Sequence, residues 1–304
     1  MQHKVALLFG FVILLAFGST VQAGDYVLTE LGSGGPSMWG LLAGPVATDI
    51  HMNGPGVSSG NAGISAGTLS LSQSVSPGIN GNVYLATGAT VSNPSLVSGS
   101  IFTGQDAVVN AAVSAAQNAS ANFSSLAPTI TTITAFNSAM TINSNPNANG
   151  VTVINLTGGI QLTNASDVIT LVGNSTQDFV INVSSQFQMM NAAMIVLSGG
   201  LIPAHVVFNV ESSVATIQTS GGLSQEPVLN GILLANGAKL QFATMSVVGE
   251  IFTNAKGDQF ASGSTYTQAP PPSGPGVPEP VTLLLIGPAL GALVLWRRAK
   301  GTSI

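Results

Sequence analysis

The second half of this chain is an array of short apolar segments separated by turn residues. From residue 151 onward, segments rich in Val, Ile and Leu begin about every 8–12 residues, and turns such as Thr157-Gly158-Gly159 and Ala235-Asn236-Gly237 separate them. Many short strands at even spacing are typical of a β-sandwich or a stacked β-solenoid. The expected strands are Val151–Leu156, Val168–Val172, Phe179–Val183, Met194–Leu197, His205–Val210, Val214–Gln218, Gly231–Leu234, Lys239–Phe242 and Ser246–Phe252.

Three properties of this array favour the solenoid. Most strands are short, their apolar positions are dominated by Val, Ile and Leu, and small turn residues recur at the expected corners. A stacked coil pairs each strand with the next coil, so few charged side chains are needed to protect sheet edges. Charged residues make up only 6% of the chain, against about 25% in ordinary globular proteins. The sequence therefore favours a solenoid, with a β-sandwich as the alternative.

Residues 24–146 are rich in Gly and turns, and one helix is expected within them at residues 105–127. Thr103 is the expected N-cap, Asp106 follows it three residues later in the manner of a capping box, and Pro128 ends the segment. Short strand-like pieces precede the helix at 67–71, 81–85 and 89–91. The apolar residues of the helix recur on one face at helical spacing, which suits packing along a flat sheet. They are Val109, Val113, Ala116 and Phe123.

Four segments of the strand array carry a family resemblance. They are Asp178-Phe-Val-Ile-Asn-Val-Ser184, Ala204-His-Val-Val-Phe-Asn-Val210, Leu229-Asn-Gly-Ile-Leu-Leu-Ala-Asn-Gly-Ala238 and Val248-Gly-Glu-Ile-Phe252. Together with the Gly/Ser-rich opening and the Ala-rich helix, they resemble the ice-binding-like and choice-of-anchor A group of secreted proteins. The resemblance implies a mainly β fold, in which residues 24–260 form a right-handed β-solenoid with one long α-helix packed alongside.

The N-terminus has the pattern of an export signal. Met1–Lys4 carries positive charge, Val5–Phe17 is apolar apart from Gly, and Val21-Gln22-Ala23 provides the small residues of a cleavage site. We expect residues 1–23 to be a signal peptide that the export machinery recognises, with cleavage between Ala23 and Gly24. A retained membrane helix is less consistent with the pattern, because the apolar stretch is short and no basic cluster follows it.

Residues 277–304 contain a second targeting pattern. The motif Pro278-Glu279-Pro280 precedes an apolar run, Val281–Trp296, which Arg297 and Arg298 close. This order resembles the PEP-CTERM sorting tail of bacterial surface proteins, which implies cleavage by an exosortase-type processing enzyme. Sixteen residues of helix span about 24 Å, short of the roughly 30 Å hydrocarbon core, and such a length favours a transient inner-membrane anchor over a permanent one. A Pro/Gly/Ser-rich linker, residues 261–276, is expected between the body and this tail.

The charge balance of the body limits its partners. Four of the six Lys and Arg residues lie in the two terminal segments, leaving Lys239 and Lys256 against ten carboxylates between residues 24 and 276. Such an acidic surface makes nucleic acid and anionic membrane surfaces poor partners. The chain has no cysteine, so a disulfide framework is excluded and stability must come from packing and backbone hydrogen bonds.

The sequence predicts no catalytic, cofactor-binding or metal-binding residue. The two body histidines, His51 and His205, lie far apart, and a structural role is expected for His205 at the start of an apolar strand. Carboxylates occur singly, without a pair at strand spacing that would indicate a glycosidase. Asp49, Asp167 and Asp178 are more consistent with turns and caps than with calcium binding. We therefore expect a protein that is not an enzyme.

Function is predicted at the level of location and surface chemistry. The targeting patterns and the polar, uncharged body favour an exported surface or matrix protein with a structural or adhesive role, associated with extracellular polysaccharide. Ice binding on the same scaffold is the alternative, because the pairs Thr129/Thr131 and Thr132/Thr134 would place hydroxyls on one strand face, as Thr265/Thr267 would in the linker. A polysaccharide-active enzyme is the third hypothesis.

Overall fold

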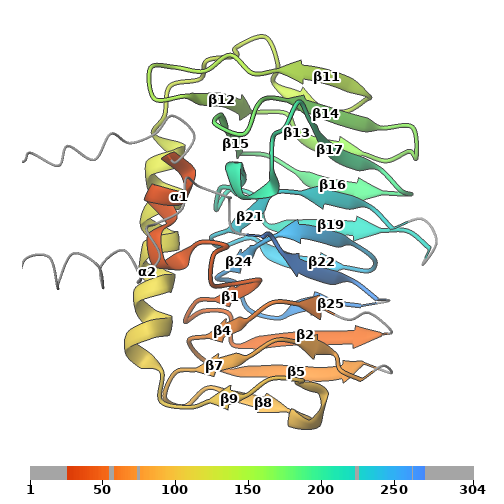
Figure 1. Cartoon of the computed structure of the whole chain (residues 1–304). Helices are drawn as coiled ribbons and strands as arrows, with labels where there is room; N and C mark the ends of the chain where they lie inside the picture. Colours follow the sequence, from red (N-terminus) through yellow and green to blue (C-terminus); the bar gives the residue numbers. More distant parts are fainter. Residues whose placement is uncertain (1–25, 55–57, 74–75, 223–225, 262, 271–304) are drawn as a thin grey trace, which may run out of the picture.

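The computed structural model describes residues 26–54, 58–73, 76–222, 226–261 and 263–270. They form a parallel β-solenoid with two α-helices on one side (Figure 1). The mainly β solenoid expected from the sequence is confirmed. The sandwich alternative is wrong, because all paired strands run parallel and successive coils stack to form three sheets. The expected signal peptide with its Ala23–Gly24 site and the tail with Pro278, Glu279, Pro280, Arg297 and Arg298 lie outside the described residues.

Each complete coil contributes one strand to each of the three sheets, and the coils at the two ends of the stack are incomplete. Sheet A pairs, in order, β12 (Val151–Leu156), β15 (Asp178–Val183), β18 (Val206–Val210), β21 (Ile232–Ala235), β24 (Ile251–Thr253), β1 (Leu41–Ala43), β4 (Ala62–Ile64), β7 (Val83–Leu85) and β9 (Ile101–Phe102). Sheet B pairs β10 (Ala135–Phe136), β13 (Gly159–Leu162), β16 (Phe187–Met190), β19 (Thr216–Ser220), β22 (Lys239–Phe242), β25 (Asp258–Phe260), β2 (Asp49–Gly54), β5 (Thr68–Gln73) and β8 (Thr90–Ser92). Sheet C pairs β11 (Met140–Asn143), β14 (Val168–Val172), β17 (Met194–Ser198), β20 (Val228–Asn230), β23 (Ser246–Gly249), β26 (Thr265–Gln268), β3 (Ser58–Ser59) and β6 (Ile79–Asn80).

The order of the coils in space differs from their order in the chain. The last coil lies in the middle of the stack, where β24 pairs with β1, β25 with β2 and β26 with β3. The N-terminal coils continue from there to β9, and α2 (Asp106–Ser124) then carries the chain back to the opposite end, where β10, β11 and β12 begin the second set (Figure 1). The long helix is therefore the connection that makes this order possible.

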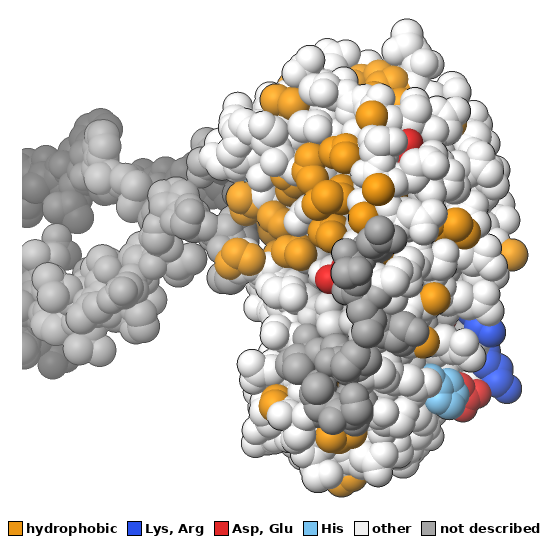
Figure 2. Space-filling model, turned by 90° about the vertical axis from the view of Figure 1, so that its right-hand side faces the viewer, with side chains coloured by type: hydrophobic (Ala, Val, Ile, Leu, Met, Phe, Trp, Pro, Cys, Tyr) orange, Lys and Arg blue, Asp and Glu red, His pale blue; other side chains and the backbone are white. Residues whose placement is uncertain are grey.

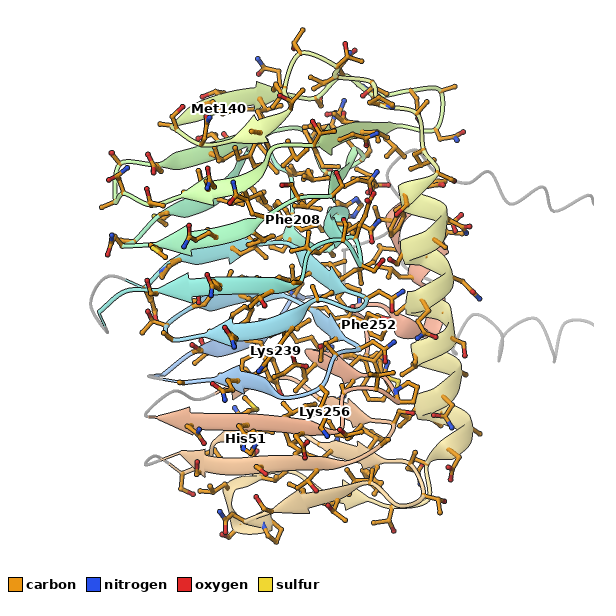
Figure 3. All side chains as sticks on the ribbon, turned by 180° about the vertical axis from the view of Figure 1, so that it is seen from behind. His51, Met140, Phe208, Lys239, Phe252 and Lys256 are labelled. Carbon is orange, nitrogen blue, oxygen red and sulfur yellow. The ribbon has the colours of Figure 1, made fainter. Side chains whose placement is uncertain are left out.

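Apolar side chains fill the solenoid from within and also seal sheet A from outside. On β15, Phe179, Ile181 and Val183 point into the interior, whereas Val180 points outward beneath the helices. Figure 3 shows Phe208 inside the coils and Phe252 on the side of α2. Sheet A is thus buried on both faces, as its continuous runs of Val and Ile predict. The side chains of β18 alternate in the same way, with Val206, Phe208 and Val210 inside and Val207 outside.

A ladder of three asparagines fastens α2 to sheet A. Asn155, Asn182 and Asn209 stand in register on adjacent strands. The Asn182 amide donates to Asn155 Oδ1 at 3.0 Å and to the Phe123 carbonyl at 2.9 Å. The Asn209 amide donates to Asn182 Oδ1 at 2.9 Å and to the Ser120 carbonyl at 3.0 Å. These bonds tie carbonyls of the last two turns of the helix to the strands of sheet A.

Three local expectations need correction. The helix begins at Asp106 after Gln105, which makes no side-chain cap bond, and Thr103 does not cap it. Asp106 instead accepts hydrogen bonds from the backbone and hydroxyl of Thr87. The solenoid extends beyond residue 260, because β26 lies within the segment expected to be a linker and completes sheet C. A short helix, α1 (Tyr26–Leu31), packs on α2 and was not expected.

Candidate functional site

The outer faces of sheets B and C remain open to solvent, whereas the helices cover much of sheet A. Every residue of β15 is buried, but buried and half-exposed residues alternate along β14 of sheet C and β16 of sheet B. In a strand with this alternation, the exposed residues line one face. The two open faces are therefore the candidate binding surfaces, and their side chains differ in kind.

Sheet B carries a ladder of five glutamines, defined here as the Gln ladder. These residues occupy the same register position on five successive strands, so their side chains project side by side. They are Gln161, Gln188, Gln218, Gln241 and Gln259. Adjacent strands lie about 4.8 Å apart, which sets the spacing of the amides. The same position continues into His51 and Ser70 on the next two strands.

A shallow groove of about 410 Å³ lies over the lower part of the Gln ladder. One side is formed by the amides of Gln218, Gln241 and Gln259, and Met190 and Ala243 contribute apolar surface beside them. The lining residues of this groove contain no acidic or basic side chain. They are Met190, Gln218, Thr219, Ser220, Gln241, Phe242, Ala243, Gln259 and Ala261.

Sheet C presents an uncharged face of mixed methyl and hydroxyl groups. One outward position is in register across five strands and passes from apolar to hydroxyl side chains. It comprises Val168, Met194, Val228, Ser246 and Thr265. A second outward position contains two in-register runs, namely Thr141, Thr170 and Val196, and then Asn230, Val248 and Thr267. Figure 2 shows apolar side chains gathered on this side, while His and Lys side chains lie on the opposite margin.

The Thr-x-Thr pairs do not form a single array. Thr129 and Ile130 lie near the end of the solenoid, where only Ile130 makes an isolated bridge to Ile154. The pair Thr265/Thr267 lies on β26 and joins the open face of sheet C, whereas a linker was expected there. A face of mixed methyl and hydroxyl groups therefore exists, and register between coils builds it from residues distant in the sequence.

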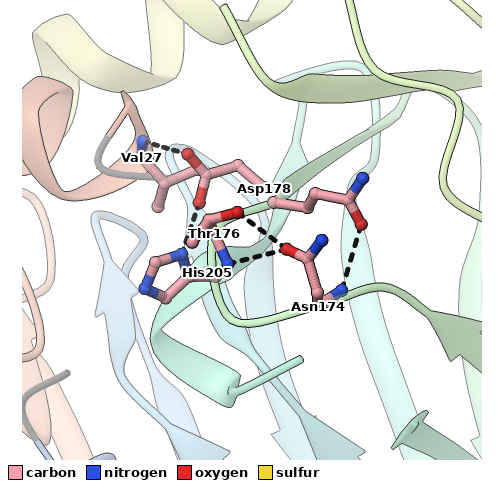
Figure 4. A network of polar contacts seen from close by, with 6 residues as sticks. Val27, Asn174, Thr176, Asp178 and His205 are labelled. Atoms are coloured by element: carbon pink, nitrogen blue, oxygen red, sulfur yellow. Dashed lines mark hydrogen bonds and ion pairs between the residues drawn. The ribbon is translucent and has the colours of Figure 1, made fainter. Parts of the chain in front are cut away.

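His205 does not open a strand as expected; it ends the 3₁₀ turn Pro203–His205, directly before β18, and is buried. Its Nδ1 lies 2.8 Å from Asp178 Oδ1, and both side chains are buried. Asp178 Oδ2 accepts the backbone N–H of Val27 at 3.2 Å, so the pair also holds α1 against sheet A (Figure 4). His51 lies instead on sheet B at the end of the Gln ladder, far from this pair in the stack. The structure does not bring the two histidines together.

The acidic residues considered for calcium binding occupy separate places. Asp167 accepts backbone N–H groups of Thr163 and Asn164 at 2.9 Å each, which is a turn role. Asp49 begins β2, and Asp178 pairs with His205. Within the described ranges, no three His, Asp or Glu side chains are placed to share a metal ion.

Two further carboxyl groups are buried. Burial raises the pKa of Asp258 to about 6, despite hydrogen bonds from Thr253 Oγ1 and the Leu240 N–H and the charge of Lys239. Burial also raises the pKa of Glu250 well above its usual value, and its oxygens have no partner among the described residues. Burial thus stabilises the neutral form of each group relative to its charged form.

The arrangement of coils and helix matches a known family. Residues 16–259 match the model of the family described as "Putative Ice-binding-like adhesive domain". The chain belongs to this family. The match confirms the resemblance to ice-binding-like proteins inferred from the Asn- and Val-containing strands. The PEP-CTERM resemblance concerns residues outside the described part of the chain and stays a prediction.

Solved structures with the same fold include several ice-binding proteins. One from Shewanella frigidimarina is 16% identical over 79% of this chain and 97% of its own, with a TM-score of 0.54. One from an Arctic yeast is 17% identical over 81% and 96%, with a TM-score of 0.52. One from an Antarctic bacterium of the Flavobacteriaceae is 16% identical over 79% and 48%, with a TM-score of 0.53. At such low sequence identities, the likeness shows that the fold is shared and nothing more.

The family and these structures are named for adhesion or ice binding rather than for catalysis. No curated protein matches the chain in sequence. Among the residues that the structure describes, no helix has the length and apolar character needed to cross a membrane. The segment with the expected anchor lies outside them.

Proposed function

We propose that this family member is a non-catalytic module that adheres to ice through the open face of sheet C. The observation that carries the proposal is the in-register, uncharged arrangement of Val, Thr and Ser on successive strands of that sheet. Ice is an uncharged lattice of water molecules, so a rigid face without charges suits it better than one bearing Lys or Asp. Ice binding by proteins of the same fold supports this choice.

The spacing of the strands supports the same proposal. Parallel strands repeat at about 4.8 Å, which is close to the repeat of water oxygens in ice along one crystal axis. Strands β11, β14 and β17 place the methyl-bearing side chains of Thr141, Thr170 and Val196 at that repeat. β-Branched side chains have few rotamers, so this surface loses little conformational entropy when it becomes ordered against a solid. Large exposed apolar patches on proteins commonly mark interaction surfaces.

The test is inhibition of ice recrystallisation by the full chain and by variants of one coil. Thr170→Lys and Val196→Lys place charges on the sheet C face, and we expect each to lower activity about tenfold, because a charge must be desolvated at the ice surface. Gln161→Lys is the matched control, since β13 and β14 are consecutive strands of the same coil but face different ways. Equal activity of all three variants would contradict the assignment of the face, and an inactive wild-type protein would refute ice binding.

The proposed function includes export and sorting. The signal-like residues 1–23 and the PEP-CTERM-like residues 277–304 support a route through the export machinery and an exosortase-type enzyme to the bacterial cell surface or matrix. Intact-mass measurement on protein recovered from the native surface should show loss of the first 23 residues and of Val281–Ile304. A chain recovered from the inner membrane and still ending at Ile304 would refute sorting, without bearing on the binding face.

A further inference from the structure

We propose that the Gln ladder and its groove on sheet B form a second binding site, for an extended uncharged polysaccharide. This site lies on a different face from the proposed ice surface and does not depend on it. The groove offers amide groups on one side and apolar atoms beside them. A pyranose ring has the complementary arrangement, with hydroxyl groups around its edge and C–H groups on its faces.

The Gln amides are free to bind a ligand. In the Asn ladder under α2, hydrogen bonds join neighbouring amides to one another and to the helix. By contrast, no side chain of the Gln ladder hydrogen-bonds to another described residue. Each glutamine carries an acceptor oxygen and two N–H donors, so one amide can both accept from and donate to adjacent sugar hydroxyls. Gln218 and Gln259 are exposed and Gln241 is half-buried, which keeps the amides accessible from the groove.

The ladder also has the length and direction of a polymer site. Its amides follow the axis of the stack, one per strand, at a spacing of about 4.8 Å, and the repeat of an extended β-1,4-linked hexose chain is close to about 5 Å per sugar. Gln218, Gln241 and Gln259 would therefore contact consecutive sugars. Gln188 and Gln161 continue the same line beyond the groove.

The charges on sheet B favour an uncharged ligand. Lys239 stands in register with Thr216, at a different outward position from the Gln ladder, and it does not line the groove. His51 and Asp49 lie on β2, outside the groove as well. An anionic polymer would lack cationic partners in the groove itself, whereas hydroxyl groups find amides there.

Titration calorimetry of the full chain in a detergent without sugar head groups tests the proposal, with cellohexaose as the probe. We expect millimolar or tighter binding, weakened about fivefold by Gln241→Ala, which is the value of one lost hydrogen bond. Gln117→Ala is the matched control, because it removes the same side chain from α2, outside sheet B, and it should change affinity less than about twofold. Thr219→Val should leave the affinity unchanged, because this side chain stands in register with the buried Met189 and Phe242 and points into the interior.

Two results would overturn the proposal: no binding of cellohexaose by the wild-type protein, or equal losses of affinity in Gln241→Ala and Gln117→Ala. Tighter binding of an oligogalacturonate of the same length would also overturn it, because it would indicate an anionic ligand. The variant Val196→Lys should bind cellohexaose normally, and Gln241→Ala should retain activity on ice. Failure of either function is thereby distinguished from failure of the other.

Discussion

Two amide ladders on the same solenoid show how one pattern takes on different roles. Asn155, Asn182 and Asn209 stack on the outer face of sheet A, where α2 covers them and accepts their hydrogen bonds. The Gln ladder stacks on sheet B, where no described element covers it. Register between identical coils produces both ladders, but the covered one is part of the fold and the open one is available for binding. The role of an amide ladder depends on whether another element packs over it, rather than on the residue type.

The largest expected effect concerns the interior that both ladders share. Phe208→Asp and Ile181→Asp each place an unpaired charge among fully buried apolar side chains. We expect the body, expressed as residues 24–270 so that β26 is included, to lose cooperative unfolding in urea followed by circular dichroism. Gln188→Asp on the open face of sheet B is the control and should unfold like the wild type. Wild-type stability of both interior variants would contradict the assignment of inward positions.

The second-largest expected effect is the difference in stability between a variant of the Asn ladder and a variant of the Gln ladder. Asn209→Ala removes bonds to Ser120 and Asn182 and leaves buried groups unpaired, so it should lower the free energy of unfolding by about 2–4 kcal/mol. Gln218→Ala removes an exposed amide and should change the free energy of unfolding by less than about 0.5 kcal/mol. Urea midpoints of the two variants provide the comparison. Equal losses would show that the open ladder is structural too.

The two histidines extend the contrast between covered and open faces. His205→Ala leaves the buried Asp178 carboxylate without its partner, and breaking a buried pair in this way costs about 3–5 kcal/mol. The variant should also loosen α1, which hydrogen exchange at the Val27 amide would report. His51→Ala, on the open face, should leave the melting temperature unchanged. A stable His205→Ala variant with a protected Val27 amide would refute the role of the pair.

Titration of Asp258, whose pKa rises from 3.8 to about 6 in the folded state, should change the free energy of unfolding by up to about 3 kcal/mol. The folded protein holds this proton more tightly, so the stabilisation is complete below pH 3.8 and is lost as pH rises through about 6. The wild type should therefore become more stable between pH 7 and pH 4, and Glu250 acts in the same direction. In thermal melts, the melting temperature of Asp258→Asn should rise less than that of the wild type from pH 7 to pH 4. An identical pH profile in the variant would show that Asp258 does not titrate as described.

Strong local patterns were predictable from the sequence. β12, β14 and β22 begin and end as expected, and the helix differs only at its ends, because continuous apolar runs and Ala-rich periodicity carry their own signals. Strands β13 and β16 were not predicted, because a glutamine interrupts their short apolar runs, and β25 was not predicted because it has only one apolar residue, Phe260. The apolar-Gln-apolar order in Ile160–Leu162, Phe187–Met189 and Leu240–Phe242 is a signal that would have located most of the ladder.

The sequence alone determined the close spacing of the strands, the family and the polar, nearly uncharged surface, because these depend on residue types and spacing along the chain. Only the tertiary structure decided which residues become neighbours. It placed the last coil between the N-terminal and C-terminal sets, paired Asp178 with His205, and aligned glutamines separated by many residues into one ladder. Such contacts arise from the register of stacked strands and from the crossing of α2. Each depends on where the whole chain lies in space, and no local pattern encodes it.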